Sequence, residues 1–289
     1  MTLAGVLRAR FPRAAANIRR YGGAATRPLD VAGRLGWFTL IGGRDIAWAL
    51  VRYRTETLRL IAQISMGTGA LAVIGGTALI VGLVTASSGS LVALQGFSAL
   101  KYVGIDALLG FAAALINTRL VAPIVTGVVL AATVGAGATA ELGAMRISEE
   151  IDALEVMGIN SMAYLVSTRA IAVQVVIIPL YALALIASFV APQLVTTVLY
   201  GQASGSYEHY FDTFLRPNDV FWSFAEMIIV AGAVMLVHCY YGYNASGGPV
   251  GVGEAVGRSM RFSLVMINVL LVLFQMALYG VNPNFNFTL

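Results

Sequence analysis

The sequence has little of the material that catalytic and metal-binding sites require. It contains one cysteine, Cys239, and two histidines, His209 and His238. A single cysteine excludes an intramolecular disulfide and any multi-cysteine metal site. Lysine occurs only at Lys101, and the phosphate-binding pattern GxxxxGK[ST] does not occur, so this chain has no such loop for holding ATP. We therefore predict a non-catalytic protein that binds no metal and no cofactor of its own.

Charged residues are also scarce, at 11% of the 289 residues, whereas 58% are hydrophobic. The mean hydropathy of +0.82 is outside the range of a soluble domain, because such a chain has too few polar side chains to cover its surface. Several apolar runs reach the roughly 20 residues that cross a bilayer as a helix. The sequence predicts an all-α integral membrane protein with several spans. The first long apolar run begins near Ile64, too late for a cleavable signal peptide.

Five transmembrane helices are predicted from the apolar runs. They cover about residues 64–86, 120–140, 170–200, 220–243 and 262–281. Residues 103–118 are apolar but short, and they lead directly into Arg119. Three interpretations of this segment stay open: a re-entrant helix, an interfacial helix in the outer leaflet, or the first part of a long, tilted second span.

Basic residues are concentrated before the first span. Residues 1–30 read as a basic tail, and residues 31–62 combine helical periodicity with tryptophan and arginine, as in an amphipathic helix in the membrane interface. A soluble helix docked on a partner is the alternative. With five spans and a cytoplasmic N-terminus, 15 of the 18 basic residues lie on the cytoplasmic side, which satisfies the positive-inside rule. We predict an extracytoplasmic C-terminus, and we attribute the net charge of +4 to membrane orientation rather than to nucleic-acid binding.

One segment between the second and third spans is unusually acidic. The stretch ELGAMRISEEIDALEVMGI, residues 141–159, holds five of the 14 acidic residues. Ser148 is a favourable N-cap, and the acids that follow it suit the positive end of a helix. Gly158 stands where a left-handed C-terminal cap is expected. The pattern predicts a cytoplasmic helix over residues 148–158.

The predicted helix has two distinct faces. Ile151, Leu154 and Met157 form an apolar stripe, and the acids form another. A solvated loop needs no aligned apolar stripe, and anionic lipid headgroups would repel the acids. This arrangement favours docking into a basic-rimmed groove of another protein, with a solvated loop as the alternative.

The acidic segment, together with LAATVGAGAT before it and YLVSTRAIA after it, closely resembles the signature of the MlaE/YrbE permease family. GVGEAV at residues 251–256 and ALYG at residues 277–280 also match, so the resemblance covers about residues 40–281. The family consists of membrane subunits of ABC lipid transporters that work with MCE proteins. Residues 63–289 would be the permease domain. The arginine-rich start and the ending YGVNPNFNFTL most resemble the B-type YrbE subunit of mycobacterial MCE systems.

The resemblance implies that the acidic segment is the coupling helix that enters a cleft of the cytoplasmic ATPase. The implied coupling residues are Glu141, Gly143, Glu149, Glu150, Asp152, Leu154, Glu155 and Gly158, with the first two at a hinge to the second span. The implied partners are an MlaF-like ATPase dimer that holds ATP and Mg, a second YrbE permease (an A-type paralogue, giving a heterodimer) and MCE proteins outside. The expected location is the inner (plasma) membrane. The expected cargo is a lipid resembling a fatty or mycolic acid, or alternatively a sterol, and the expected direction is import.

Four polar residues within or beside the predicted spans are further candidates. Glu226 inside a span is a functional hypothesis by default, although it equally suits a bond to a neighbouring helix. Arg119 could meet a lipid headgroup or an outer partner, but ordinary snorkelling is favoured. Asn268 and Gln275 share a face and are expected to bond across helices, or to line a lipid path. Two alternative functions follow: a gradient-driven secondary transporter that uses Glu226, and a passive membrane anchor for an extracellular complex.

Overall fold

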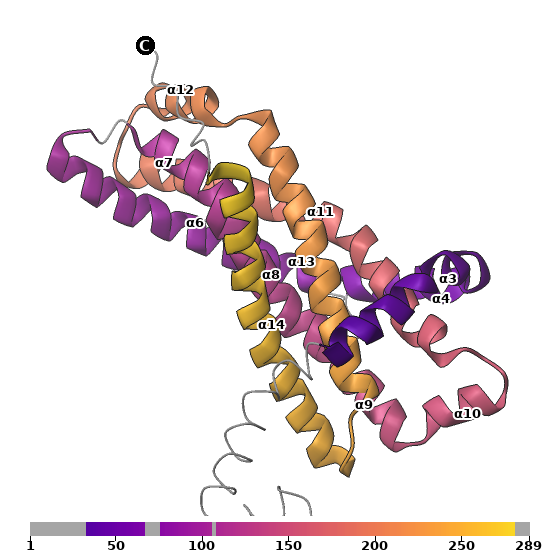
Figure 1. The fold of residues 1–289 in the computed structure, drawn as a ribbon. Helices are drawn as coiled ribbons and strands as arrows, with labels where there is room; N and C mark the ends of the chain where they lie inside the picture. Colours follow the sequence, from indigo (N-terminus) through magenta and orange to yellow (C-terminus); the bar gives the residue numbers. More distant parts are fainter. Residues whose placement is uncertain (1–32, 67–75, 106–107, 281–289) are drawn as a thin grey trace, which may run out of the picture. The chain divides into compact units, whose positions relative to one another are not determined.

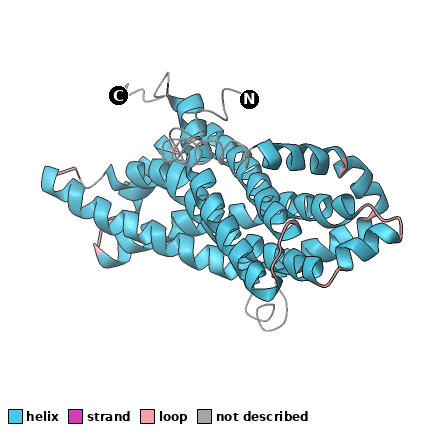
Figure 2. Cartoon of the chain, turned by 60° about the horizontal axis from the view of Figure 1, so that its bottom comes forward, coloured by secondary structure: helices cyan, strands magenta, loops and turns pink. Residues whose placement is uncertain are grey.

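The computed structural model describes residues 33–66, 76–105 and 108–280. The predicted basic tail, residues 1–30, lies outside the described residues. Every regular element in the described part is helical, and no strand occurs there (Figure 2), which confirms the predicted all-α class. Residues 33–44 form a helix that belongs to a separate unit, and the following description concerns the unit that begins at Asp45.

Three helices occupy the segment predicted as one interfacial helix over residues 31–62. They are the helix of residues 33–44, α3 (Ile46–Arg52) and α4 (Arg54–Met66). The break between α3 and α4 falls at Tyr53, whose backbone leaves the helical region. Its ring packs edge-on against Trp48 and Tyr164, with centroids 5.2 and 5.1 Å away. These ring contacts hold α3 and α4 against the start of the third span.

Among the described residues, five helices are long and apolar enough to cross a membrane, as predicted, and together they make a multi-pass membrane protein. They are Gly76–Tyr102, Leu109–Ile147, Met162–Leu199, Pro217–Tyr243 and Gly248–Tyr279. The first, fourth and fifth correspond to α6 (Gly76–Val103), α13 (Pro217–Tyr243) and α14 (Gly248–Tyr279). The second joins α7 (Leu109–Ile116), η2 (Asn117–Val121), α8 (Ala122–Leu130), η3 (Ala131–Gly135) and α9 (Ala136–Ile147), and the third joins η4 (Met162–Ser167), α11 (Thr168–Leu194) and η5 (Val195–Leu199).

The first span lies later in the sequence than predicted. α6 begins at Gly76, where φ is +52°, and of the predicted residues 64–86 the segment 67–75 lies outside the described residues. The polar stretch that follows the predicted span does not end the helix. The hydroxyls of Ser87, Ser88 and Ser90 donate to backbone carbonyls four residues earlier, which satisfies them inside α6.

The second span continues through the segment that the sequence left open. Its helix begins at Leu109 and runs 39 residues to Ile147, so residues 109–118 extend the span. At 1.5 Å per residue the helix is about 58 Å long, roughly twice the hydrocarbon thickness of a bilayer. A π-helical turn, η2, interrupts it at Asn117, whose side-chain amide donates to the carbonyl of Ser188 on α11 at 2.8 Å.

The helix of the last span starts earlier in the sequence than the predicted residue 262. α14 begins at Gly248, so GVGEAV lies in the helix and not in a loop. Gly247 at φ +93° turns the chain into the helix, and Pro249 occupies the first turn, where proline removes no intrahelical hydrogen bond.

Two short helices connect the spans at opposite ends. α10 (Glu150–Val156) follows α9, and α12 (Ser204–Phe214) packs on α7 at the other end (Figure 1). On α12 the side chain of Tyr207 is buried, and burial raises the pKa of its phenol, which stays protonated at neutral pH. The spans pack mainly as α11 against α6 and α4, and as α13 against α14 and α9.

The contact between α13 and α9 depends on a glycine. A Cβ added to Gly242 would lie 2.9 Å from the carbonyl oxygen of Thr139, which is backbone and cannot rotate away. Small residues let membrane helices approach this closely, and the gain is van der Waals packing. Gly137 on α9 is the opposite case, because an added Cβ there meets nothing within 4 Å.

We expect Gly242→Ala to destabilise the protein by about 1–3 kcal/mol, because overpacking forces α13 and α9 apart. The matched change Gly137→Ala is expected to be neutral, or stabilising by up to about 1 kcal/mol, since alanine replaces glycine in a helix at no steric cost. Thermal unfolding of the two purified variants in detergent measures the difference. Equal melting temperatures for both would contradict the close approach at Gly242.

Candidate functional site

The acidic segment forms a helix, but it begins differently from the prediction. Ser148 is not an N-cap: its hydroxyl donates to the carbonyl of Ala144 at 3.0 Å, and its backbone ends α9. Glu149, with φ at +61°, makes the left-handed turn that starts α10 at Glu150. The polar side chain of Ser148 favoured a cap, but the i−4 carbonyl of the preceding helix was the nearer partner.

The C-terminal end follows the prediction. Gly158 has φ +76°, a conformation that glycine adopts without strain. Its N–H donates to the carbonyl of Glu155 at 2.9 Å, and the N–H of Ile159 donates to Leu154 at 3.0 Å. These bonds satisfy carbonyls in the last turn of α10. The helix has seven residues, so it is shorter than the helix predicted over residues 148–158.

The outward apolar face of α10 is not the predicted one. Ile151 is fully buried against its own chain, and Leu154 is half-buried. The exposed apolar residues are Val156, at 89% exposure, and Met157, at 66%. With exposed Ala153 they stand at i, i+3 and i+4, so they share one face of a helix. A short helix needs one apolar residue to attach it to the protein, and Ile151 has that role.

The acids of α10 divide into paired and unpaired groups. Asp152 forms an ion pair of 2.6 Å with Arg146 at the end of α9. A carboxylate oxygen of Glu155 accepts hydrogen bonds from Ser161 at 2.7 Å and from Tyr243 at 3.3 Å. A carboxylate oxygen of Glu150 lies 2.9 Å from the Ser148 hydroxyl, whose one proton it shares with the carbonyl of Ala144, and Glu149 is exposed. Asp152 and Glu155 therefore tie α10 to its own chain, whereas Glu149 and Glu150 face solvent.

The loop after α10 is connected to the helices that precede the spans. The side-chain amide of Asn160 donates to Asp45 at 3.1 Å, at the start of α3. Its carbonyl oxygen accepts from the backbone N–H of Ala163 in the first turn of η4. α10 is thus connected to α3, η4, α9 and α13, the last through Tyr243.

Glu141 and Gly143 lie within α9 and not at a hinge. Gly143 is buried, and an added Cβ there would lie 2.9 Å from a methyl of Val252 on α14. Glu141 pairs with Arg169 of α11 at 3.1 Å, and the guanidinium of Arg169 also donates to the carbonyl of Leu165 at 2.9 Å. Arg169 is buried, with a side chain only 5% exposed. The sequence reasoning missed this residue, although an arginine at the start of an apolar run was a usable signal.

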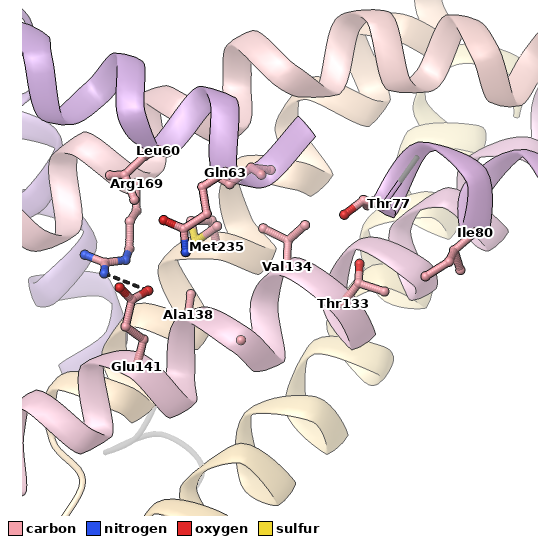
Figure 3. Close-up of a pocket in the computed structure, with 13 residues that line it drawn as sticks. Leu60, Gln63, Thr77, Ile80, Thr133, Val134, Ala138, Glu141, Arg169 and Met235 are labelled. Carbon is pink, nitrogen blue, oxygen red and sulfur yellow. Dashed lines mark ion pairs between the residues drawn. The ribbon is translucent and has the colours of Figure 1, made fainter. Parts of the chain in front are cut away.

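The ion pair of Glu141 and Arg169 forms part of the lining of a cavity of about 500 Å³. Figure 3 shows residues from α4, α6, η3, α9, α11 and α13 around it, with Arg169, Glu141 and Gln63 toward one side of the view and Thr77 and Thr133 toward the other. A second cavity, of about 730 Å³, extends toward Ser148 and Glu150. Glu141 and Arg169 line both cavities, so the ion pair stands in the wall between them.

The polar residues at the other end of the spans form a buried network. Arg119 pairs with Asp219 of α13 at 2.8 Å, and their side chains are 12% and 7% exposed. The guanidinium also stacks over the ring of Tyr279 at 3.8 Å, and the hydroxyl of Tyr279 donates to Asp219 at 3.1 Å. The predicted snorkelling of Arg119 is therefore wrong, because a carboxylate 100 residues away in sequence provides a buried partner.

Gln275 extends this network, and Asn268 does not. The amide of Gln275 donates to the carbonyl of Arg119 at 2.8 Å and lies 3.5 Å from a carboxylate oxygen of Glu226, so it bonds across helices as predicted. Glu226 is buried. Asn268 is half-exposed and donates to Leu264 of its own helix. Asn268 and Gln275 line a third cavity, of about 340 Å³, on the face of α14.

No cluster of three or more histidine, cysteine or acidic side chains that could hold a metal ion occurs in the part of the chain that the structure describes. His238 is buried, and its Nδ1 lies 2.8 Å from the hydroxyl of Thr139. The arrangement provides an exposed helix tied to the spans, and cavities between the spans.

Comparisons with known proteins agree with this architecture. Residues 66–277 match the family described as permease MlaE. A probable ABC transporter permease of Synechocystis is 28% identical over 195 residues, which cover 67% of this chain and 74% of that protein. One of Rickettsia bellii is 28% identical over 197 residues, covering 65% and 73%. The chloroplast protein trigalactosyldiacylglycerol 1 of Arabidopsis thaliana is 28% identical over 165 residues, covering 57% and 47%. Because the family match includes most of the chain and all five spans almost completely, the chain belongs to the MlaE permease family.

Proposed function

We propose that this ABC permease is the membrane subunit of an ATP-driven lipid transporter and that α10 is its coupling helix. The observation that carries the proposal is the exposed apolar face of α10, Ala153, Val156 and Met157, on a helix bonded to the spans. Apolar side chains this exposed at the end of a membrane protein suit a contact with another protein. Glu149 and Glu150 beside them are exposed and form no ion pair with the residues that the structure describes, which suits a basic rim.

The bonds of α10 give the route by which a partner acts on the spans. Asp152 ties α10 to α9 through Arg146, and Glu155 ties it to α13 through Tyr243. When ATP closes the cytoplasmic ATPase dimer, the cleft moves α10, and these bonds transmit the movement to the second and fourth spans. The permease itself makes and breaks no covalent bond. Glu141 and Gly143 act in this scheme as packing and ion-pair residues of α9.

The cargo we propose is a hydrophobic lipid resembling a fatty or mycolic acid, with a sterol as the alternative. The support is the apolar lining of the cavities and the name of the Arabidopsis relative, which is that of a galactolipid. We further propose import across the inner membrane of a mycobacterial cell envelope. The second permease is an A-type paralogue, and MCE proteins stand outside. The N-terminus is cytoplasmic and the C-terminus extracytoplasmic.

Purification of the tagged chain from native membranes tests this proposal. Mass spectrometry of the complex is expected to identify an ATPase, a second permease and a bound lipid, and the complex is expected to hydrolyse ATP and move lipid between liposomes. A complex without an ATPase contradicts the proposal. Lipid movement that needs an ion gradient and no ATP would favour a secondary transporter, and no lipid movement under either condition would favour a passive anchor.

Glu226 distinguishes the secondary-transporter alternative. Its buried Oε1 has no hydrogen-bond partner among the residues that the structure describes, which is the observation in favour of a proton site. We expect Glu226→Gln to retain ATP-driven transport within about twofold of wild type, because an amide keeps the size of the side chain and can still bond to Gln275. Transport into proteoliposomes with ATP measures this. Abolished transport in Glu226→Gln, with the complex still assembled, would support the proton site instead.

A further inference from the structure

We infer that the cavity of about 500 Å³ between α4 and the spans binds an amphiphile with an uncharged, hydrogen-bonding head group and an apolar tail. The cavity lies in the half of the helices nearer α10, because its polar wall is formed by Glu141 in the middle of α9 and Arg169 at the start of α11. Its volume is within the range of about 300–1,000 Å³ that small-molecule sites have. α4 covers it from the side opposite α9, so the site has a wall that no span contributes.

The polar groups of this cavity define the head group. Arg169 is buried and compensated by Glu141 at 3.1 Å, so the two charges cancel. An anionic or cationic head group finds no free counter-charge among the described residues that line the cavity, because the two charged ones already pair with each other, and the apolar lining would desolvate it at a cost. An uncharged head group with a hydroxyl or ester meets no such penalty. A hydroxyl can donate to the carboxylate of Glu141, which is 45% exposed and so can be reached, and an ester carbonyl can accept from the amide of Gln63.

The remaining lining defines the tail. Leu60 and Ile64 of α4, Ile80 of α6, Val134 of η3 and Met235 of α13 present apolar side chains to the cavity. The hydroxyl of Thr133 already donates to the carbonyl of Val129 at 2.7 Å, so this bond does not need a ligand. The cavity thus has one charged end and a mostly apolar remainder that includes the hydroxyls of Thr77 and Thr133, so the charged end sets the orientation of an amphiphile inside it.

Three kinds of molecule share this chemistry: a monoacylglycerol, a protonated fatty acid and a sterol. The head group lies at the wall formed by Glu141 and Arg169, and beyond this wall the second cavity extends toward Ser148 and Glu150, beside α10. The inference rests on the proposed function only where it regards the bound molecule as cargo. Binding itself requires neither ATP nor the ATPase.

The test is photolabelling of the complex purified from native membranes, in nanodiscs and without nucleotide. Four probes carry a diazirine in the apolar part: a monoacylglycerol, a fatty acid, a sterol and lysophosphatidic acid, which is anionic. Mass spectrometry of the peptides locates the label. We expect label on residues 60–64 and 133–138 from at least one uncharged probe, with about tenfold less from lysophosphatidic acid at equal concentration. For the fatty acid we expect labelling to increase as pH falls, because the protonated form is the ligand.

Two variants of α9 make the test specific to the cavity. Gly137 lines it, and a Cβ there meets nothing within 4 Å, so Gly137→Leu grows into the space of the ligand. We expect it to reduce labelling about tenfold or more. Ala140→Leu, on the same helix, at an exposed position that does not line the cavity, should leave labelling unchanged. Gln63→Leu should weaken labelling by the monoacylglycerol several-fold while the complex stays assembled.

The inference is overturned if lysophosphatidic acid labels these peptides as strongly as the uncharged probes, or if Gly137→Leu labels like the unchanged protein. The variant Val156→Asp distinguishes a failure of this inference from a failure of the proposed function. If this variant loses the ATPase but keeps the label, the cavity and the coupling role of α10 are both supported. If label is absent while the complex still moves lipid with ATP, the cavity is excluded as the site and the proposed function stands.

Discussion

Asp219→Ala is expected to destabilise the protein by about 3–5 kcal/mol, the cost of removing one partner of a buried ion pair. The carboxylate lies 2.8 Å from Arg119, and the two side chains are only 7% and 12% exposed. Without it the guanidinium keeps its stacking on the ring of Tyr279, but its charge stays buried and uncompensated. Tyr279 also loses the carboxylate to which its hydroxyl donates.

The double variant Arg119→Leu/Asp219→Leu is expected to recover most of this loss. It removes both charges, and apolar residues replace a buried ion pair at little or no cost in stability. Equilibrium unfolding in mixed micelles, measured for the two single variants and the double variant, gives the coupling energy of the pair. Asp212→Ala on α12 is the control, because Asp212 is exposed and its loss should change stability by less than about 0.5 kcal/mol. If Asp219→Ala unfolds like Asp212→Ala, the pair is not a buried interaction in the membrane.

Val156→Asp is expected to separate the permease from its ATPase without unfolding it. Val156 is 89% exposed, so a carboxylate there costs the isolated permease almost nothing. In a contact that buries α10, the same carboxylate is desolvated without a partner. A loss of about 2 kcal/mol, which is typical of an interface hot spot, weakens the complex roughly 30-fold. The amount of ATPase that co-purifies with the tagged variant measures the effect, and Met157→Asp should behave similarly.

A matched control for Val156→Asp is available at the same end of the protein. Val250 in the first turn of α14 is 77% exposed, and α14 packs there on α9 near Gly143. Val250→Asp introduces the same charge at the same end but outside α10, so we expect it to retain the ATPase. Leu154→Arg, which the sequence alone would choose, is a weaker test because Leu154 is half-buried against its own chain. Equal retention of the ATPase by Val156→Asp and Val250→Asp would exclude α10 as the main contact.

The sequence predicted the helical class, the number of spans and the position of α10, because each depends on local signals. Long apolar runs, clustered acids and Gly158 are visible within a window of about 20 residues. The end of the first span was misplaced because Ser87, Ser88 and Ser90 look like the end of an apolar run, although their hydroxyls bond to carbonyls within α6. Its start was marked in the sequence by the pair Gly75 and Gly76, a turn signal that hydropathy alone does not weigh.

The candidate site was less predictable because its pairs join distant positions. Arg119 and Asp219 are 100 residues apart, and Arg169 meets Glu141 only after two spans pack together. The faces of α10 show the same limit. Ile151 and Val156 are both aliphatic, and only the tertiary packing of α10 decides that Ile151 is buried and Val156 is exposed.

α13 connects the two ends of the protein as a single rod. Asp219 is its third residue and Tyr243 its last, so about 36 Å of helix separates the pair with Arg119 from the bond to Glu155. The second and third spans contain π-helical turns, whereas α13 has neither such a turn nor a proline beyond its first residue. A displacement of α10 is therefore not absorbed by an irregular turn within α13. In the proposed coupling scheme, the ion pair of Arg119 and Asp219 would be the fixed point about which α13 turns, so a change in its strength would alter how far the spans separate at that end for a given displacement of α10.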